Sequence, residues 1–135
     1  MSSVSVKDLI GVPYKVHGRS KEEGFDCYGV DIEVYKRHGR YLPDIDYDSP
    51  EEYENVYLSV LHKVKYTKVD RPEELSLIMI SLKGEPRHTG VYLGNGLFIH
   101  ATRNLGVIVE PLHRWANRVV GYYNVSECKD NQESV

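Results

Sequence analysis

The sequence contains little that would support export, membrane insertion or binding to nucleic acid. There are two cysteines in 135 residues, whereas a small secreted domain held by disulfides normally carries more. The N-terminal segment MSSVSVKDLIGVPY has no positively charged start and no long apolar run, so we expect no signal peptide. No segment reaches the roughly 18 apolar residues that a membrane span requires. The net charge of −3 at pH 7 excludes the basic excess that favours a nucleic-acid partner.

The size and composition indicate one domain with an ordinary core. The length of 135 residues is typical of a single domain, and 41% of the residues are hydrophobic. We expect residues 1–126 to form this domain and the polar residues 127–135 to form a disordered tail. The protein is therefore expected to be made in the cytoplasm as one structural unit.

Helical patterns occur in the first half of the chain. The best defined one covers residues 26–38, where apolar residues recur at helical spacing. Asp26 suits its N-cap, and Gly39 follows a basic last turn. A short helix is also predicted at residues 5–11 and a longer one at residues 49–65.

Strand patterns fill the second half of the chain. Five segments are rich in Val, Ile, Leu and Tyr, and turns that contain glycine separate several of them. They read ELSLIMISL, HTGVYLG, LFIHATR, GVIVEPL and VVGYYNV. A short helical turn, LHRWANR, is expected between the last two. Helices followed by strands argue for an α+β fold with an antiparallel sheet.

Two of the six histidines, His88 and His100, lie on one predicted hairpin. A two-residue turn at 95–96 would place them on opposite faces of the sheet, because side chains alternate along a strand. A three-residue loop at 94–96 would place them on one face, as diagonal neighbours about 7–8 Å apart. The second register also gathers aliphatic side chains on the other face, namely Val91, Leu93, Leu97 and Ile99. The cleaner pattern favours the three-residue loop.

Cys27 falls in the first turn of the helix predicted at 26–38. At such a position the helix dipole favours the thiolate. A nearby histidine can take the thiol proton and form an ion pair, and a second polar group can orient that histidine. His88 and His100 are the candidates for these roles. The alternatives are a buried structural thiol for Cys27, a surface side chain for His88 and a satisfied core histidine for His100.

Three longer segments strengthen the catalytic interpretation. In chain order they read GVPYKVHGRSKEEGFDCYGV, HTGVYLGNGLFIHA and GVIVEPLHRWANRVVGYYNV. Together they resemble the NlpC-type family of cell-wall cysteine peptidases. The family pattern runs Pro-Tyr, a Gly-rich loop, Phe-Asp-Cys-Ser-Gly, a helix, Leu-Pro, then His-Val-Gly-Ile-Tyr-Leu-Gly-Asn-Gly and Phe-Ile-His-Ala. The resemblance extends from about residue 8 to residue 125.

The resemblance implies a reduced papain-like fold, in which N-terminal helices pack on a small C-terminal antiparallel sheet. It also implies a cysteine endopeptidase without a cofactor, which hydrolyses peptidoglycan stem peptides between D-γ-glutamate and the following diamino acid. Carried across, Cys27 is the nucleophile, His88 is the general base and then acid, and His100 orients His88.

Two further residues match positions near the substrate in the family. Tyr14 matches a tyrosine that lines the cleft and helps the Cys27 backbone N–H to form an oxyanion hole. Asp26 matches an aspartate that helps to bind the free amine of the substrate. Packing is the alternative role for Tyr14, and helix capping is the alternative for Asp26.

Tyr28 departs from the family pattern, which has serine at this position. That serine helps to hold the substrate amine, so Tyr28 is a candidate substrate-binding residue with an altered subsite. The Asp-Cys-Tyr-Gly wording resembles variants in bacteriophage tail-tip proteins. This resemblance favours the hypothesis that the protein is a component of a phage or prophage tail that acts on the cell wall. Other tail proteins would then be its partners. The alternative is a non-catalytic structural or binding module that keeps the fold, with Tyr28 filling the subsite. Acyl transfer on a related fold is a third interpretation.

The sequence favours no metal site. It has neither Cys-x-x-Cys nor His-Glu-x-x-His spacing, and a structural zinc site normally uses four ligands. Cys128 lies in the predicted polar tail and is expected to be a free thiol without a role.

Overall fold

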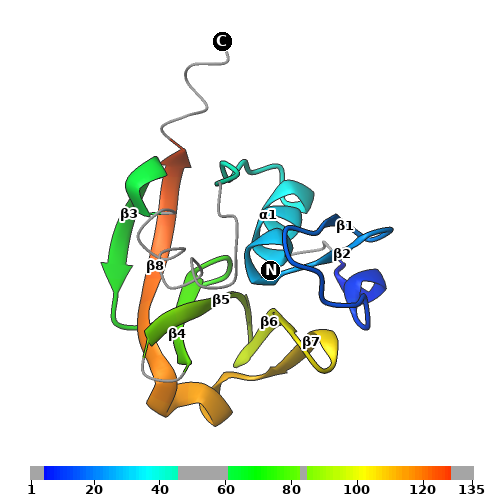
Figure 1. Cartoon of the computed structure of the whole chain (residues 1–135). Helices are drawn as coiled ribbons and strands as arrows, with labels where there is room; N and C mark the ends of the chain where they lie inside the picture. Colours follow the sequence, from blue (N-terminus) through cyan, green and yellow to red (C-terminus); the bar gives the residue numbers. More distant parts are fainter. Residues whose placement is uncertain (1–4, 46–60, 83–84, 129–135) are drawn as a thin grey trace.

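We describe the protein from a computed structural model, which covers residues 5–45, 61–82 and 85–128 (Figure 1). In chain order the elements are the 3₁₀ helix η1 (Lys7–Leu9), β1 (Arg19–Ser20), β2 (Gly24–Phe25), α1 (Cys27–Arg37), β3 (Val64–Val69), β4 (Leu77–Leu82), β5 (Glu85–Gly94), β6 (Leu97–Thr102), β7 (Gly106–Pro111), the 3₁₀ helix η3 (Leu112–Arg118) and β8 (Val119–Cys128).

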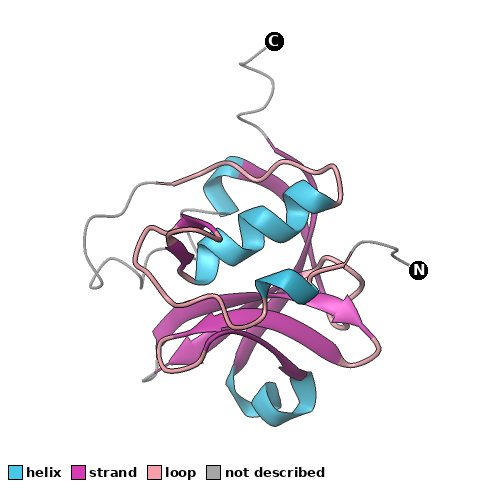
Figure 2. Cartoon of the chain, turned by 90° about the vertical axis from the view of Figure 1, so that its right-hand side faces the viewer, coloured by secondary structure: helices cyan, strands magenta, loops and turns pink. Residues whose placement is uncertain are grey.

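One six-stranded antiparallel sheet organises the chain. Its strand order is β3-β8-β4-β5-β6-β7, and β1 and β2 form a separate two-stranded sheet. In Figure 2, α1 lies above the large sheet and η3 lies below it. The two faces of the central strands therefore have different neighbours. The predicted α+β arrangement, with a helix packed on an antiparallel sheet, is confirmed.

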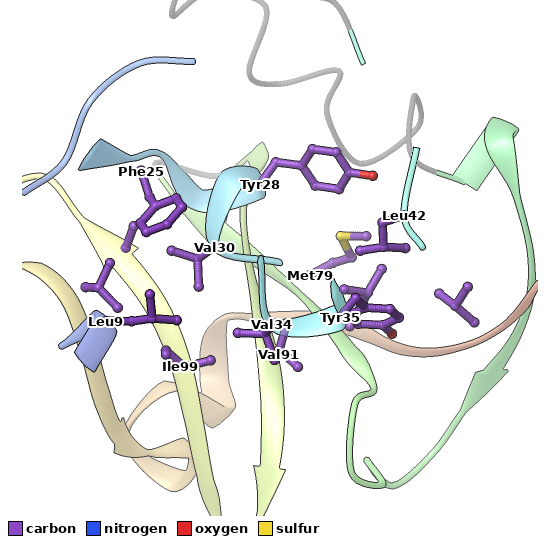
Figure 3. Close-up of a cluster of buried hydrophobic side chains, with 14 of the residues drawn as sticks. Leu9, Phe25, Tyr28, Val30, Val34, Tyr35, Leu42, Met79, Val91 and Ile99 are labelled. Carbon is purple, nitrogen blue, oxygen red and sulfur yellow. The ribbon is translucent and has the colours of Figure 1, made fainter. Parts of the chain in front are cut away.

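The main core lies between α1 and the sheet (Figure 3). It joins Val30 and Val34 of the helix to Val91 and Ile99 of the sheet, and all four side chains are fully buried. A smaller cluster of Ile78, Ile80 and Phe98 lies on the other face, where η3 supplies Leu112 and Trp115. Neighbouring residues of one strand belong to different clusters, because side chains alternate between the two faces of a sheet.

The helix predicted at 26–38 is confirmed, with the bounds Cys27–Arg37. The Asp26 side chain caps it by accepting a hydrogen bond of 2.8 Å from the Gly29 N–H. Gly39 follows the helix in the left-handed region, at a φ of 72°, where glycine carries no Cβ penalty. The sequence therefore fixes both ends of the element that carries Cys27.

The β5–β6 hairpin confirms the predicted strand register but corrects the turn. Val91 pairs with Ile99, and His88 and His100 share a face, as expected. The connection is a two-residue turn with Asn95 and Gly96 both at positive φ, and a bulge precedes it between 92 and 94. The bulge adds one residue to β5. The two-residue turn together with the bulge therefore gives the same pairing of β5 with β6 that was predicted from a three-residue loop.

Five other elements differ from the expectations. The segment at 5–11 contains only the three-residue η1. Strands β1 and β2 lie in the segment before α1, where no strand was predicted. Strand β3 begins at Val64, inside the helix predicted at 49–65, and most of that predicted helix lies outside the described residues. Strand β8 continues to Cys128, two residues beyond the predicted domain boundary at 126. Within the described ranges, no helix is long and apolar enough to cross a membrane.

Candidate active site

Cys27 is the first residue of α1, and its side chain is 2% exposed. The helix start is held by the buried Asp26. One of its carboxylate oxygens accepts from Gly29 N–H and from the Arg19 guanidinium, and the other accepts from His17 N–H at 2.8 Å. This network ties the first turn of α1 to the loop before it and fixes the position of the Cys27 backbone.

Thr89 of β5 and the two acids near the helix start influence the pKa of the Cys27 thiol. The backbone and the side chain of Thr89 lower this pKa. Burial is the largest effect, and together with the charges of Asp26 and Asp31 it raises the pKa of the Cys27 thiol to about 12. Desolvation thus opposes the favourable effect that the helix dipole was expected to have on the thiolate.

A chain of hydrogen bonds crosses the three strands β5, β6 and β7. His88 Nε2 lies 2.7 Å from His100 Nδ1, and His100 Nε2 lies 2.6 Å from Glu110 Oε2. His100 is fully buried and His88 is 7% exposed. The predicted neighbourhood of His88 and His100 is confirmed, and Glu110 is a third member that the sequence did not single out.

The order of donors along this chain follows from Glu110. A neutral imidazole has one N–H donor and one acceptor nitrogen. Because Glu110 accepts, His100 donates from Nε2 and carries its lone pair on Nδ1. His100 Nδ1 then accepts from His88 Nε2–H. The lone pair of His88 is consequently on Nδ1, the nitrogen that is available as a base.

Aromatic rings enclose the histidine pair. Phe98 stacks on His100 with ring centroids 4.3 Å apart, and Trp115 of η3 meets the His100 ring edge-on at 5.2 Å. Trp115 also stacks with His88 at 6.2 Å. These rings exclude water from the His88–His100 hydrogen bond, which strengthens its electrostatic component.

Burial, with a smaller contribution from the neighbouring His100, lowers the pKa of His88 to about 3. Burial also lowers the pKa of His100, although Glu110 opposes this shift. Both rings are therefore neutral at pH 7, and the Cys27 thiol is neutral as well. These pKa shifts favour a neutral thiol beside neutral imidazoles.

The lowered pKa of His88 predicts how stability depends on pH. In the unfolded chain His88 binds a proton near pH 6.5, whereas the folded chain resists that proton down to about pH 3. The free energy of unfolding should thus be unaffected by His88 above pH 6.5. Below it, stability should fall by up to about 1.4 kcal/mol per pH unit. Urea unfolding at several pH values measures this slope. The change in the free energy of unfolding per pH unit should be smaller in His88→Gln than in wild type. Equal slopes in the two proteins would contradict a neutral, buried His88 ring.

Tyr14 lies beside the segment that precedes α1. It forms an isolated bridge with Phe25, and the Arg103 guanidinium lies 5.0 Å from the centre of its ring. The ring is half-buried and packs against the main core. This position is compatible with both the packing role and the cleft role that the sequence left open.

Tyr28 lies in the core. It is 0% exposed, and its hydroxyl donates a 2.6 Å hydrogen bond to the Pro43 carbonyl oxygen (Figure 3). In this conformation the ring supports α1 from inside the molecule and presents no atom to solvent. The predicted contact of Tyr28 with substrate remains a prediction, and the buried position of the ring speaks against it.

Removing the Tyr28 hydroxyl should therefore affect stability and spare the site. Tyr28→Phe leaves the Pro43 carbonyl without this donor, which should lower the free energy of unfolding by about 1–3 kcal/mol. Thermal or urea unfolding measures the loss. A Tyr28→Phe protein with wild-type stability but changed activity would instead indicate a substrate contact.

The structure thus gathers Cys27 and Asp26 at the start of α1, and His88 and His100 on the neighbouring strands. Glu110 was missed, although a signal existed. His100 pairs with Ile108, so Glu110 lies two residues along β7 on the same face. Pairing LFIHAT with GVIVEP would have placed it beside His100. Among the described residues, no group of three or more His, Cys, Asp or Glu side chains could hold a metal ion.

A helix that begins at a buried cysteine and packs on an antiparallel sheet with a hydrogen-bonded histidine pair is typical of a papain-like α+β protein. A sequence model of the NlpC/P60 family matches residues 11–124. The chain belongs to the NlpC/P60 family. The peptidoglycan hydrolases of this family are cysteine peptidases.

Curated relatives and solved structures agree with this assignment. The chain is 32% identical over 114 residues to the murein DD-endopeptidase MepS/murein LD-carboxypeptidase of Escherichia coli K12, which covers 82% of this chain and 54% of that protein. It is 26% identical over 125 residues to the gamma-DL-glutamyl hydrolase of Bacillus subtilis strain 168, which covers 85% of this chain and 27% of that one. The chain therefore spans about a quarter to a half of these relatives.

Two solved structures show the same fold. The NlpC/p60 domain of the peptidoglycan hydrolase SagA has a TM-score of 0.60 at 24% identity, and the alignment covers 89% of this chain and 91% of that one. An NlpC/P60 family protein from Bacillus cereus ATCC 10987 has a TM-score of 0.62 at 26% identity, with 84% and 35% covered. These similarities confirm the predicted reduced papain-like architecture.

Proposed function

We propose that this chain is a cysteine endopeptidase that hydrolyses amide bonds in peptidoglycan stem peptides. The observation that carries the proposal is the ordered hydrogen-bond chain Glu110–His100–His88, which leaves the lone pair of His88 on Nδ1. His88 lies on β5, and the helix that begins at Cys27 packs on this strand. A nucleophile, a base and a group that orients the base are the parts that acyl transfer requires.

In the proposed reaction, His88 Nδ1 removes the proton from the Cys27 thiol as the sulfur attacks the scissile carbonyl carbon. The C–N bond then breaks, His88 returns the proton to the leaving amine, and a thioester remains on Cys27. Water, deprotonated by His88, hydrolyses this thioester. The Cys27 backbone N–H, with Tyr14, is proposed to stabilise the negative oxygen of the tetrahedral intermediates. The neutral resting pair suits this cycle, because the charges appear only in the reacting complex.

The proposed substrate is the D-γ-glutamyl–diamino acid bond of the stem peptide. Support for this bond comes from the similarity to the gamma-DL-glutamyl hydrolase. The similarity to the murein DD-endopeptidase/LD-carboxypeptidase supports peptidoglycan as the substrate without specifying this bond. Asp26 remains the proposed partner of the substrate amine. Its carboxylate already binds Gly29, His17 and Arg19 and is fully buried. We therefore propose that Asp26 acts on the amine through the negative electrostatic potential of its carboxylate and by holding the first turn of α1 in position.

The proposed setting is a phage or prophage tail that opens the wall locally. The protein would be made in the cytoplasm and carried to the wall with tail proteins as partners. The support is the Asp-Cys-Tyr-Gly wording at 26–29. The non-catalytic alternative rested on Tyr28 filling the subsite, and the Tyr28 ring lies in the core instead.

A panel of defined stem peptides tests the proposed function. Wild-type protein should release products cut after D-γ-glutamate, identified by mass spectrometry, and peptides with an α-linked L-glutamate should remain intact. If no peptide and no purified wall preparation is cut, the non-catalytic module becomes the better account. A product in which the acyl group joins another amine instead of water would indicate acyl transfer.

Glu110 is expected to act by positioning His100. Glu110→Gln keeps the size of the side chain but removes its charge, and its amide can present a donor that favours the wrong His100 tautomer. We expect kcat to fall by about 10–100-fold with little change in KM, by analogy with the loss of groups that orient a metal-bound histidine. Steady-state kinetics measures kcat and KM separately. Glu74→Gln, at an exposed position, is the matched control and should retain wild-type kcat.

A further inference from the structure

An exposed arginine, Arg103, lies in the turn between β6 and β7, three residues after His100. Its guanidinium carbon lies 5.0 Å from the centre of the Tyr14 ring, which is within cation–π range. Among the described residues, no acidic side chain forms an ion pair with Arg103 and no acceptor takes a hydrogen bond from its guanidinium. Nothing in the proposed reaction uses this positive charge.

Backbone contacts fix the two segments that meet at this arginine. Gly11 N–H donates to the Val107 carbonyl oxygen at 2.8 Å, and Val107 N–H donates to the Val12 carbonyl oxygen at 3.0 Å. Gly106 lies so close to Val12 that an added Cβ would come within 2.3 Å of the Val12 carbonyl oxygen. The Thr102 hydroxyl closes the turn by donating to the Gly106 carbonyl oxygen at 3.1 Å. The turn is therefore held against the segment that carries the aromatic ring.

The contact lies between the two halves of the candidate active site. Tyr14 forms its bridge with Phe25, which is two residues before Cys27. On the other side, β6 leads directly from His100 to the turn that carries Arg103. An anion bound to the guanidinium would consequently lie close to both the start of the nucleophile helix and the strand that carries the histidine.

The charges of the two segments also favour an anion. Residues 9–21 and residues 86–109, which supply them, contain no Asp or Glu, although the whole chain has a net charge of −3. The first segment adds a further exposed cation, Lys15, next to Tyr14. A cation–π contact does not require a hydrogen bond, so the N–H donors of Arg103 remain available to an anionic ligand.

The proposed substrate carries such an anion beside its scissile bond. A glutamate that is linked through its γ-carbonyl keeps a free α-carboxylate, a few bonds from the carbonyl carbon that Cys27 attacks. A guanidinium can bind a carboxylate through two parallel hydrogen bonds, which are stronger than bonds between neutral groups. We propose that Arg103 binds the α-carboxylate of the D-γ-glutamyl residue and so selects stem peptides in which this carboxylate is free. The inference rests on the proposed function, since it assigns a specificity residue to the same site.

Two peptides that differ in one group test the proposal. One is L-Ala-D-γ-Glu-L-Lys, and the other has an amide of nearly the same size in place of the α-carboxylate. Wild-type protein should cleave the carboxylate peptide with a kcat/KM about tenfold above that for the amide peptide. Arg103→Gln should abolish this difference, and Arg103→Lys should keep part of it, because an ammonium retains the charge without the planar fork. Arg114→Gln, at an exposed position on η3, is the matched control and should keep the wild-type ratio.

The ratio of the two kcat/KM values separates substrate binding from support of the Tyr14 ring. Loss of that support in Arg103→Gln would lower kcat/KM for both peptides by the same factor and leave the ratio unchanged. An unchanged ratio in this variant would overturn the proposal. Equal kcat/KM values for the two peptides in wild type would overturn it as well.

Binding distinguishes a failure of this inference from a failure of the peptidase. In Cys27→Ala, isothermal titration calorimetry should show about tenfold tighter binding of the carboxylate peptide than of the amide peptide. Adding Arg103→Gln should remove this preference. If wild type cuts neither peptide but Cys27→Ala shows the preference, the peptidase is refuted and the role of Arg103 stands. Equal binding of the two peptides, or binding of neither, refutes the role of Arg103.

Discussion

Replacing His88 by alanine is expected to lower kcat/KM for stem-peptide hydrolysis by about 10³-fold or more. A positioned general base contributes about 10²–10⁴-fold, and His88 also serves as the acid for the leaving amine. Its loss removes both roles and leaves the Cys27 thiol, whose pKa is raised to about 12, without a proton acceptor. Kinetics on the stem peptide that wild type cleaves best would measure the loss.

The matched control for this variant is His113→Ala, which removes an exposed histidine of η3. It should retain wild-type kcat/KM. Circular dichroism should show that both proteins are folded, because His88→Ala also removes a buried ring. A folded His88→Ala protein with activity within a few fold of wild type would contradict the assignment of the base.

Gly29→Ala should cause the largest loss of stability among single methyl additions to α1. A Cβ at Gly29 would lie 2.2 Å from the Gly18 carbonyl oxygen and 3.3 Å from Asp26 Oδ1. Alanine is a better helix former by about 1 kcal/mol. The clash is with backbone, however, so α1 must move from the loop that caps it. We expect a net loss of about 1–3 kcal/mol in the free energy of unfolding, at the upper end of that range.

This displacement should also lower activity, because Cys27 and the Asp26 cap lie in the same turn. Urea unfolding measures the stability, and peptide hydrolysis under folding conditions measures the activity. Lys36→Ala, at an exposed position in the last turn of α1, is the control and should leave both nearly unchanged. If Gly29→Ala were as stable as wild type, the close contact between Gly29 of α1 and the Gly18 carbonyl oxygen would be wrong.

The helix and its cap could be predicted because their signals are local. Asp26, the apolar spacing and Gly39 all lie within a few residues of the ends that they determine. The face shared by His88 and His100 was also predictable, since alternation along a hairpin has only two solutions. The bulge at Leu93 was not, because a bulge and a longer loop give the same register at the histidines.

Other features depend on contacts between distant segments. Glu110 reaches His100 only because β7 pairs with β6, and no local pattern marks a glutamate in a strand as the partner of a histidine. Tyr28 was expected near substrate because it follows Cys27 in sequence, but one step along a helix turns a side chain by about 100°. That rotation takes the ring into the core, where its hydroxyl meets Pro43.

The thiol pKa illustrates a different limit. The position of Cys27 at a helix start indicates one effect that favours the thiolate, the helix dipole. Its burial, and the presence of Asp26 and Asp31 within reach, could be known only from the packed structure, and together they reverse the direction. The same packing supplies Thr89, which offsets part of that cost.

In the proposed reaction, Cys27 carries the acyl group of the substrate during hydrolysis. The most direct measurement is mass spectrometry of an acid-quenched reaction with a cleavable stem peptide, after digestion to the fragment that contains Cys27. That fragment should gain the mass of the acyl half of the substrate, and Cys27→Ala should show neither the adduct nor hydrolysis. Hydrolysis that continues at the wild-type rate in Cys27→Ala would contradict the account.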